Sequence, residues 1–202
     1  MVAAAQSEAA VLDRQYHARL LADIDGVCRV AGVKKELISH PAKWYCSKGE
    51  VAWLRDFRAR VASGSAGLML VGPNHNGKNA AGDLGTVNVT PALKMMAMAA
   101  ALLRNYIDAR VLSVTTLIED DEVGDVPDPT VLLVPDFYVD FEGGKQLPAY
   151  KAQRLYSILM DRYVASRATI LYVQSVGGLE KNYGGAMKDF LDAHWIKSLG
   201  KD

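Results

Sequence analysis

Apolar and polar residues follow one another in blocks that are typical of strands separated by helices. Four apolar runs predict buried strands, at residues 67–71, 111–115, 131–134 and 169–173. Three longer segments with apolar residues at helical spacing predict helices, at residues 91–106, 147–164 and 183–199. Strands separated by helices favour right-handed crossovers and a parallel sheet that is covered on both faces. The predicted fold is therefore a three-layer α/β domain.

Two amphipathic helices are predicted before the first strand, at residues 7–25 and 50–61. A sheet of this kind does not need them, so we divide the chain into an N-terminal helical extension with its lead-in, residues 1–62, and a core, residues 63–202. The first helix carries an apolar stripe that includes Leu12, Tyr16 and Leu20. This stripe would either anchor a partner or pack against the protein's own core.

Composition excludes several classes of protein. Hydrophobic residues make up 50% and charged residues 23%, as in ordinary globular chains. The 23 Lys and Arg residues balance the 23 Asp and Glu residues, so no overall basic field indicates nucleic-acid binding. Cys28, His40 and Cys46 match no standard spacing of metal ligands. The alanine-rich start is interrupted by charged residues, unlike a signal peptide, and no 18-residue apolar run occurs, so we expect a cytoplasmic protein without a membrane span.

The segment Gly72-Pro-Asn-His-Asn-Gly-Lys-Asn79 directly follows the first predicted strand and has the G-x-x-x-x-G-K spacing of a phosphate-binding loop. In such a loop, backbone N–H groups converge on phosphate oxygens and the lysine ammonium meets the β- and γ-phosphates. Asn79 stands where Ser or Thr would bind Mg²⁺, and its amide oxygen is also a ligand for a hard cation. The pattern predicts ATP and Mg²⁺ as cofactors; the alternative is a connecting loop. The predicted nucleotide-binding residues are Gly72, Asn76, Gly77, Lys78 and Asn79.

Asp136 follows the apolar run Val131-Leu-Leu-Val-Pro, at the carboxyl end of a buried strand, where ligands bind in such sheets. A carboxylate there would hold Mg²⁺ or polarise water during phosphoryl transfer, so Asp136 is the predicted catalytic and metal-binding residue, with Asp140 and Glu142 as substitutes. The alternative is a carboxylate that caps a turn or helix. Gln174 and Ser175 end the next strand and are the predicted sensors of the γ-phosphate.

The order of these features resembles the AAA+ helicase loaders of the DnaC/IstB type, over roughly residues 32–191. The similarity rests on Gly67–Pro73, Gly77-Lys-Asn79, Val131–Asp136, Leu155–Tyr163 and the approach to Gln174-Ser175. The resemblance implies an AAA+ (RecA-like) P-loop NTPase core and an ATP-binding DNA-replication accessory protein. It also implies engagement of a replicative helicase, and it is compatible with contact to single-stranded DNA and with homo-oligomers.

Three departures from the family pattern concern hydrolysis. The next helix-start signal, Thr90-Pro91, comes well after Lys78, although a working loop runs directly into a helix. Asp136 is a single acid, and the place of the family's arginine finger offers only Lys188. We therefore expect weak or absent ATP hydrolysis; the alternative function is a catalytically inactive adaptor, a pseudo-ATPase that acts only through protein contacts.

Overall fold

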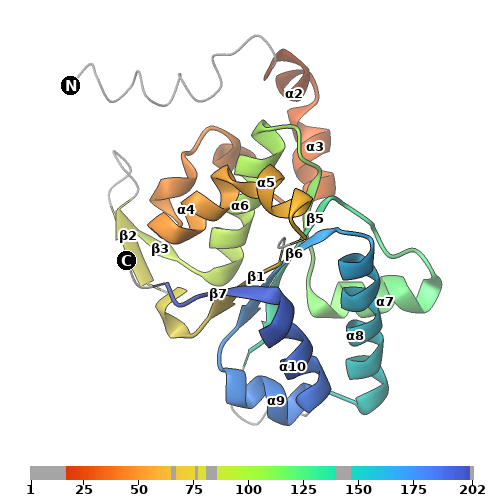
Figure 1. The fold of residues 1–202 in the computed structure, drawn as a ribbon. Coiled ribbons are helices and arrows are strands. Elements are labelled where there is room, and N and C mark those ends of the chain that lie inside the picture. Colours follow the sequence, from red (N-terminus) through yellow and green to blue (C-terminus); the bar gives the residue numbers. More distant parts are fainter. Residues whose placement is uncertain (1–16, 65–66, 76, 81–85, 140–146, 201–202) are drawn as a thin grey trace.

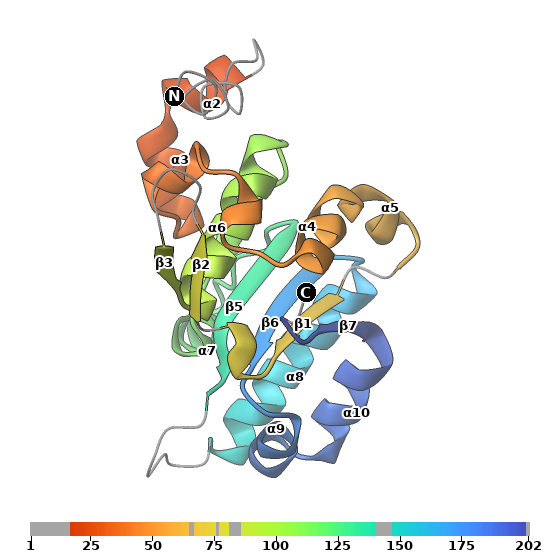
Figure 2. The ribbon, with the colours of Figure 1, turned by 90° about the vertical axis from the view of Figure 1, so that its left-hand side faces the viewer.

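The computed structural model describes residues 17–64, 67–75, 77–80, 86–139 and 147–200. At its centre lies a parallel five-stranded sheet with the strand order β4-β5-β6-β1-β7 (Figures 1 and 2). The strands are β1 (Gly67–Val71), β4 (Ala109–Val111), β5 (Val131–Tyr138), β6 (Ala168–Val173) and β7 (Trp195–Ser198). The predicted α/β fold with a parallel sheet is confirmed.

Helices cover both faces of the sheet (Figure 2). One face packs against α3 (Ile24–Ala31), α4 (Lys48–Arg55), α5 (Phe57–Ala62) and α6 (Pro91–Arg104). The other face packs against α7 (Val114–Val123), α8 (Ala149–Val164), α9 (Val176–Tyr183) and α10 (Gly185–His194). The short helix α2 (Ala18–Ala22) precedes α3. None of the described helices is long and apolar enough to cross a membrane.

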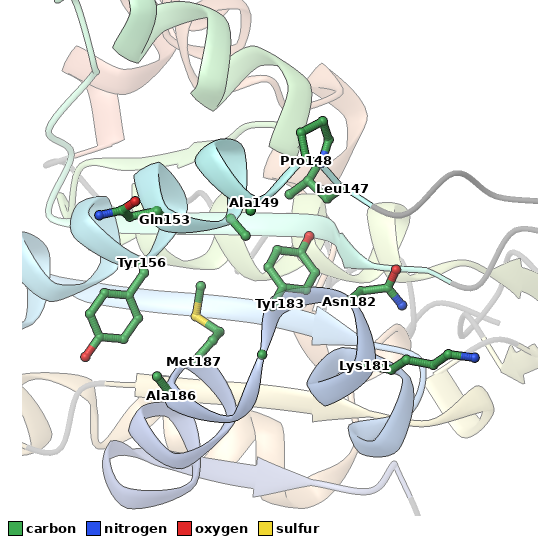
Figure 3. Close-up of a pocket in the computed structure, with 12 residues that line it drawn as sticks. Leu147, Pro148, Ala149, Gln153, Tyr156, Lys181, Asn182, Tyr183, Ala186 and Met187 are labelled. Carbon is green, nitrogen blue, oxygen red and sulfur yellow. The ribbon is translucent and has the colours of Figure 1, made fainter.

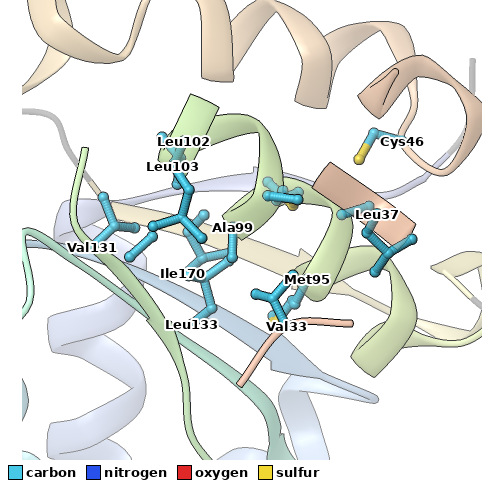
Figure 4. Packing of buried hydrophobic residues seen from close by; sticks show 14 of the residues in the cluster. Val33, Leu37, Cys46, Met95, Ala99, Leu102, Leu103, Val131, Leu133 and Ile170 are labelled. Carbon is cyan, nitrogen blue, oxygen red and sulfur yellow. The ribbon is translucent and has the colours of Figure 1, made fainter. Parts of the chain in front are cut away.

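Successive side chains of each strand point to opposite faces of the sheet, so each strand contributes to the cores on both faces. In β1, Leu68 and Leu70 belong to the cluster under α6, whereas Met69 belongs to the cluster under α7 to α10. Figure 4 shows the first cluster, in which Met95 and Ala99 of α6 pack with Leu133 and Ile170 of the sheet. Side chains that precede β1, such as Leu37 and Trp53, lie in the same cluster, so the N-terminal helices and the sheet share one core.

The chain passes from β1 through α6 to β4 at the far edge, returns through β5 and β6, and then adds β7 on the other side of β1. All carboxyl ends therefore lie at one edge of the sheet, with β1 at the point where the strand order reverses. Leu70, near the end of β1, lies opposite Tyr172 of β6 and Ser198 of β7. In open α/β sheets such a reversal is where ligands bind.

Several elements differ from the sequence-based expectations. The predicted helix 50–61 is divided at Asp56 into α4 and α5. In its described part the predicted helix 7–25 is interrupted at Asp23, and the following helix α3 continues past residue 25 and ends at Gly32 in the left-handed conformation. The predicted strand 111–115 ends at Val111, because Ser113 accepts a hydrogen bond from Thr116 and starts α7. The predicted helix 183–199 is broken at Gly184 and ends in strand β7, whose pairing with β1 overrides its helical pattern.

Candidate functional site

The connection between β1 and α6 is the region where a phosphate-binding loop was predicted. Gly72 has φ +92°, and its N–H group donates to the carbonyl of Val173 at 2.9 Å. A 3-10 turn follows at Pro73–His75, and then the hairpin of β2 (Gly77–Ala80) and β3 (Thr86–Val89). In this hairpin Lys78 lies opposite Asn88. The backbone at Gly77, Lys78 and Asn79 is thus a strand and not the first turn of a helix.

Helix α6 begins only at Pro91, after the hairpin. Proline has no N–H group, and the side chain of Thr90 accepts the N–H group of Leu93 at 3.2 Å. The start of α6 therefore lacks most of the free donors that a triphosphate would need. The described backbone does not fit a phosphate cradle. Nucleotide contacts of Gly72, Gly77, Lys78 and Asn79 remain a prediction, and Asn76 lies outside the described residues.

A buried cluster of ionisable side chains occupies this end of the sheet instead. The carboxylate of Glu50 is 0% exposed, and Lys94 Nζ lies 3.3 Å from its Oε1 and 3.1 Å from its Oε2. His75 Nδ1 lies 3.1 Å from both Glu50 Oε1 and Lys94 Nζ. Ser198 Oγ donates to Glu50 Oε1 at 3.1 Å, and His75 Nε2 lies 3.0 Å from the Ser198 carbonyl. One carboxylate thus connects α4, the β1–α6 connection, α6 and β7.

Local structure holds each member of the cluster. Glu50 is the third residue of α4 and forms a capping box with Ser47, whose N–H group donates to Oε2 at 2.8 Å. Lys94 lies in the first turn of α6. His75 Nε2 carries a proton, because a carbonyl oxygen can only accept. Nδ1 then accepts from Lys94 in the neutral ring or donates to Glu50 in the protonated ring, and both states keep the carboxylate hydrogen-bonded.

Electrostatics favour the ionised carboxylate. Burial alone would raise the pKa of Glu50, but the hydrogen bond from His75, the charge of Lys94 and the Ser47 N–H group outweigh it and lower the pKa to about 2. Cys46, buried beside this carboxylate, has a raised pKa, first through burial and then through the charge of Glu50. The cluster therefore consists of a carboxylate anion that contacts Lys94 and His75, next to a neutral thiol.

The cluster was not predicted from the sequence, although two signals for it are present there. Ser47-Lys-Gly-Glu50 has the spacing of a capping box, which places the carboxylate at a helix start. Lys94 interrupts an otherwise apolar helical stretch, and a lysine at such a position needs a buried partner. Neither signal shows that the two residues, which lie far apart in sequence, meet.

Asp136 lies in an irregular part of β5, between the paired residues Val134 and Tyr138. Its Oδ1 accepts the N–H group of Val114, the first residue of α7, at 3.0 Å. Burial raises its pKa, and the Val114 hydrogen bond opposes that shift. The carboxylate thus has the helix-capping role named as the alternative, and its role in catalysis or Mg²⁺ binding remains a prediction. Asp140 and Glu142 lie outside the described residues.

The other predicted residues have local structural roles. Ser175 is the N-cap of α9, where its Oγ accepts the N–H group of Gly178 at 3.1 Å. The backbone N–H group of Gln174 donates to the Tyr138 carbonyl at 2.9 Å. Lys188 lies 3.6 Å from Asp192 in α10. In the part of the chain that the structure describes, no group of three His, Cys, Asp or Glu residues is arranged to hold a metal ion.

A hollow lies on the other face of the sheet, between the start of α8 and the junction of α9 and α10 (Figure 3). Its volume is about 670 Å³, and Tyr156, Asn182, Tyr183 and Met187 contribute to its lining. Tyr183 links it to the end of β5, because its hydroxyl donates to the Phe137 carbonyl. Burial, followed by the charge of Asp136, raises the pKa of Tyr183.

Comparison with known proteins identifies the fold. No protein-family model matches the sequence, and no curated protein is significantly similar to it. The crystal structure of the DnaC helicase loader matches with a TM-score of 0.50 and 15% identity, covering 83% of this chain and 100% of that chain. The replication initiator DnaA bound to AMPPCP and single-stranded DNA matches with a TM-score of 0.51 and 11% identity, covering 79% of this chain and 49% of that chain. This chain spans about half the length of that DnaA chain. The chain thus has the fold of AAA+ P-loop proteins, and its predicted resemblance to DnaC-type loaders is confirmed at the level of fold.

Proposed function

We propose that this protein is a DNA-replication accessory protein of the helicase-loader type that binds a replicative helicase and acts as a pseudo-ATPase adaptor. The observation that carries the proposal is the β1–α6 connection, whose described residues form the β2–β3 hairpin, with the Glu50 carboxylate of α4 buried against its His75. The fold shared with the DnaC helicase loader supports a replication role. A partner of that kind implies a cytoplasmic location.

The helices before the sheet offer the surface for the helicase. Leu20, one of the expected anchors, is buried in the core, whereas Leu12 and Tyr16 lie outside the described residues. The neighbouring Leu21 of α2 is 46% exposed, and Val30 of α3 is 58% exposed. Exposed aliphatic side chains on helices are typical anchors for a partner. We assign the contact to Leu21 and Val30.

A second candidate is an ATP-binding loader with weak hydrolysis, and the G-x-x-x-x-G-K spacing at Gly72–Lys78 favours it. In this function Lys78 contacts phosphate, while Asn79 and Asp136 hold Mg²⁺. Single-stranded DNA and further copies of the chain would be its additional partners. The two candidates differ in whether nucleotide binds.

A thermal-unfolding titration with Mg·ATP and Mg·ADP separates the two candidates. A binder at ~100 times its Kd gains about 2.7 kcal/mol of stability by mass action. If the protein is an adaptor, millimolar nucleotide should leave the Tm of the wild type and of Lys78→Ala unchanged. A shift in the wild type that Lys78→Ala abolishes would support the ATP-binding loader.

Co-purification with the replicative helicase of the same organism tests the partner. We expect the wild type to be retained by immobilised helicase and the double variant Leu21→Ser, Val30→Ser to be lost. Val123→Ser is the matched control, because Val123 is 78% exposed in α7, outside the proposed surface. Retention of the double variant would show that the contact lies elsewhere, and a wild type that does not bind would refute the helicase partner.

A further inference from the structure

Two basic groups converge at the carboxyl end of β1, on the side of α6. Lys94 extends from the first turn of α6, and His75 comes from the turn that leaves β1. His75 also contacts the ring of Tyr172, with ring centroids 6.2 Å apart, and Tyr172 lies opposite Leu70 in the sheet. The pair thus sits at the reversal of strand order, where a sheet of this type binds anionic ligands.

The anion that these groups hold is part of the protein itself. Glu50 reaches the site from α4, which precedes the sheet in sequence. Its Oε1 contacts Lys94, His75 and Ser198, and its Oε2 contacts Lys94 and the Ser47 N–H group, all within 3.3 Å. The ammonium of Lys94, the imidazole of His75 and the hydroxyl of Ser198 are donors of the kinds that bind phosphate groups as well as carboxylates.

We propose that Lys94, His75 and Ser198 form an anion site of the phosphate class whose occupant is the carboxylate of Glu50. The internal ligand fixes α4 to α6 and β7, so the fold has its site filled without nucleotide. This inference rests on the proposed pseudo-ATPase role in one respect, namely that the protein functions without bound nucleotide. The helicase contact is not involved, so each proposal can fail without the other.

Removing the carboxylate should convert the filled site into an open one. We would measure thermal unfolding of Glu50→Ala in inorganic phosphate, whose size is close to that of the atoms removed, against sodium chloride of equal ionic strength. Saturating inorganic phosphate, at ~100 times its Kd, should raise the Tm of Glu50→Ala by about 5–10 °C. The wild type and the control Asp56→Ala, which removes an exposed carboxylate paired with Arg55, should not respond.

Two results would overturn the proposal. One is a Glu50→Ala variant whose Tm responds to inorganic phosphate no more than that of Asp56→Ala. The other is a response that persists in Glu50→Ala, Lys94→Met, because the anion would then bind elsewhere. If Glu50→Ala is unfolded without anions, recovery of a cooperative transition in inorganic phosphate is the expected result, and no recovery overturns the proposal.

Discussion

Glu50 and Lys94 are buried and in direct contact, and a buried charge is costly once its partner is removed. Lys94→Met leaves the Glu50 carboxylate in a site that excludes water and without the lysine charge, although Ser47, His75 and Ser198 still contact it. We therefore expect Lys94→Met to lower the free energy of unfolding by about 3–5 kcal/mol. Urea denaturation measures this change.

The control is Lys35→Met, which removes the exposed ion pair between Lys35 and Asp25. An exposed pair contributes about 0–1 kcal/mol, so this variant should be nearly neutral. Adding Glu50→Gln to Lys94→Met should restore part of the lost stability, because no isolated charge remains. If Lys94→Met and Lys35→Met lowered the free energy of unfolding equally, the coupling between Lys94 and Glu50 would be contradicted.

The lowered pKa of Glu50 predicts a pH dependence of stability. Its pKa is about 2 in the folded protein and 4.5 in the ordinary, unfolded environment, so its contribution is complete above pH 4.5. As pH falls from 4.5 towards 2, the carboxylate beside Lys94 and His75 gains a proton and the contribution is lost. Glu50→Gln should therefore lose less stability over this range than the wild type does. If urea denaturation showed that the free energy of unfolding falls equally in the two proteins between pH 4.5 and 2, Glu50 would not be the responsible group.

At the scale of elements, the carboxylate of Asp136 stabilises the start of helix α7. It accepts the Val114 N–H group, and a hydrogen bond to a charged group contributes about 1.5–3 kcal/mol. We expect Asp136→Ala to destabilise the protein by about that amount, whereas Asp136→Asn, which keeps an acceptor, should cost less. Chemical denaturation of both variants provides the measurement. If Asp136→Ala were as stable as the wild type, the Asp136 carboxylate would not stabilise the start of α7.

Strand β7 packs closely on β1 at Gly67. A Cβ atom on Gly67 would lie 2.7 Å from the ring of Trp195, which is buried in the core. Gly67→Ala should thus destabilise the protein by about 1–3 kcal/mol through overpacking. Gly177→Ala is the matched control, because a Cβ there meets nothing within 4 Å and alanine favours helix α9 by about 0.5–1 kcal/mol. If both variants were equally stable in thermal unfolding, Trp195 would not pack on Gly67 as described.

For the whole molecule, the parallel sheet was predictable because its central strands are continuous apolar runs that need burial on both faces. Three of the four predicted strands, in the runs that contain Leu68, Leu132 and Ile170, lie where they were expected. Strand β7 was not predictable, since Ile196-Lys-Ser198 has no strand pattern and depends on pairing with β1. The hairpin in the β1–α6 connection likewise depends on antiparallel pairing between two short segments.

The candidate site was less predictable than the fold. The spacing from Gly72 to Lys78 describes residue types, whereas a phosphate cradle also requires a helix that starts at the lysine. The first turn of α6 instead carries Lys94, whose partners come from α4 and the turn after β1. Contacts between segments that are distant in sequence leave no local pattern, so only the folded structure shows them.

The central claim is that this AAA+ fold acts as an adaptor without nucleotide. The most direct test is the fraction of protein retained by the immobilised replicative helicase of the same organism, measured without nucleotide, with Mg·ADP and with Mg·ATP, for the wild type and for Lys78→Ala. The adaptor predicts equal retention in all six measurements. Retention that requires Mg·ATP in the wild type and is lost in Lys78→Ala would contradict it.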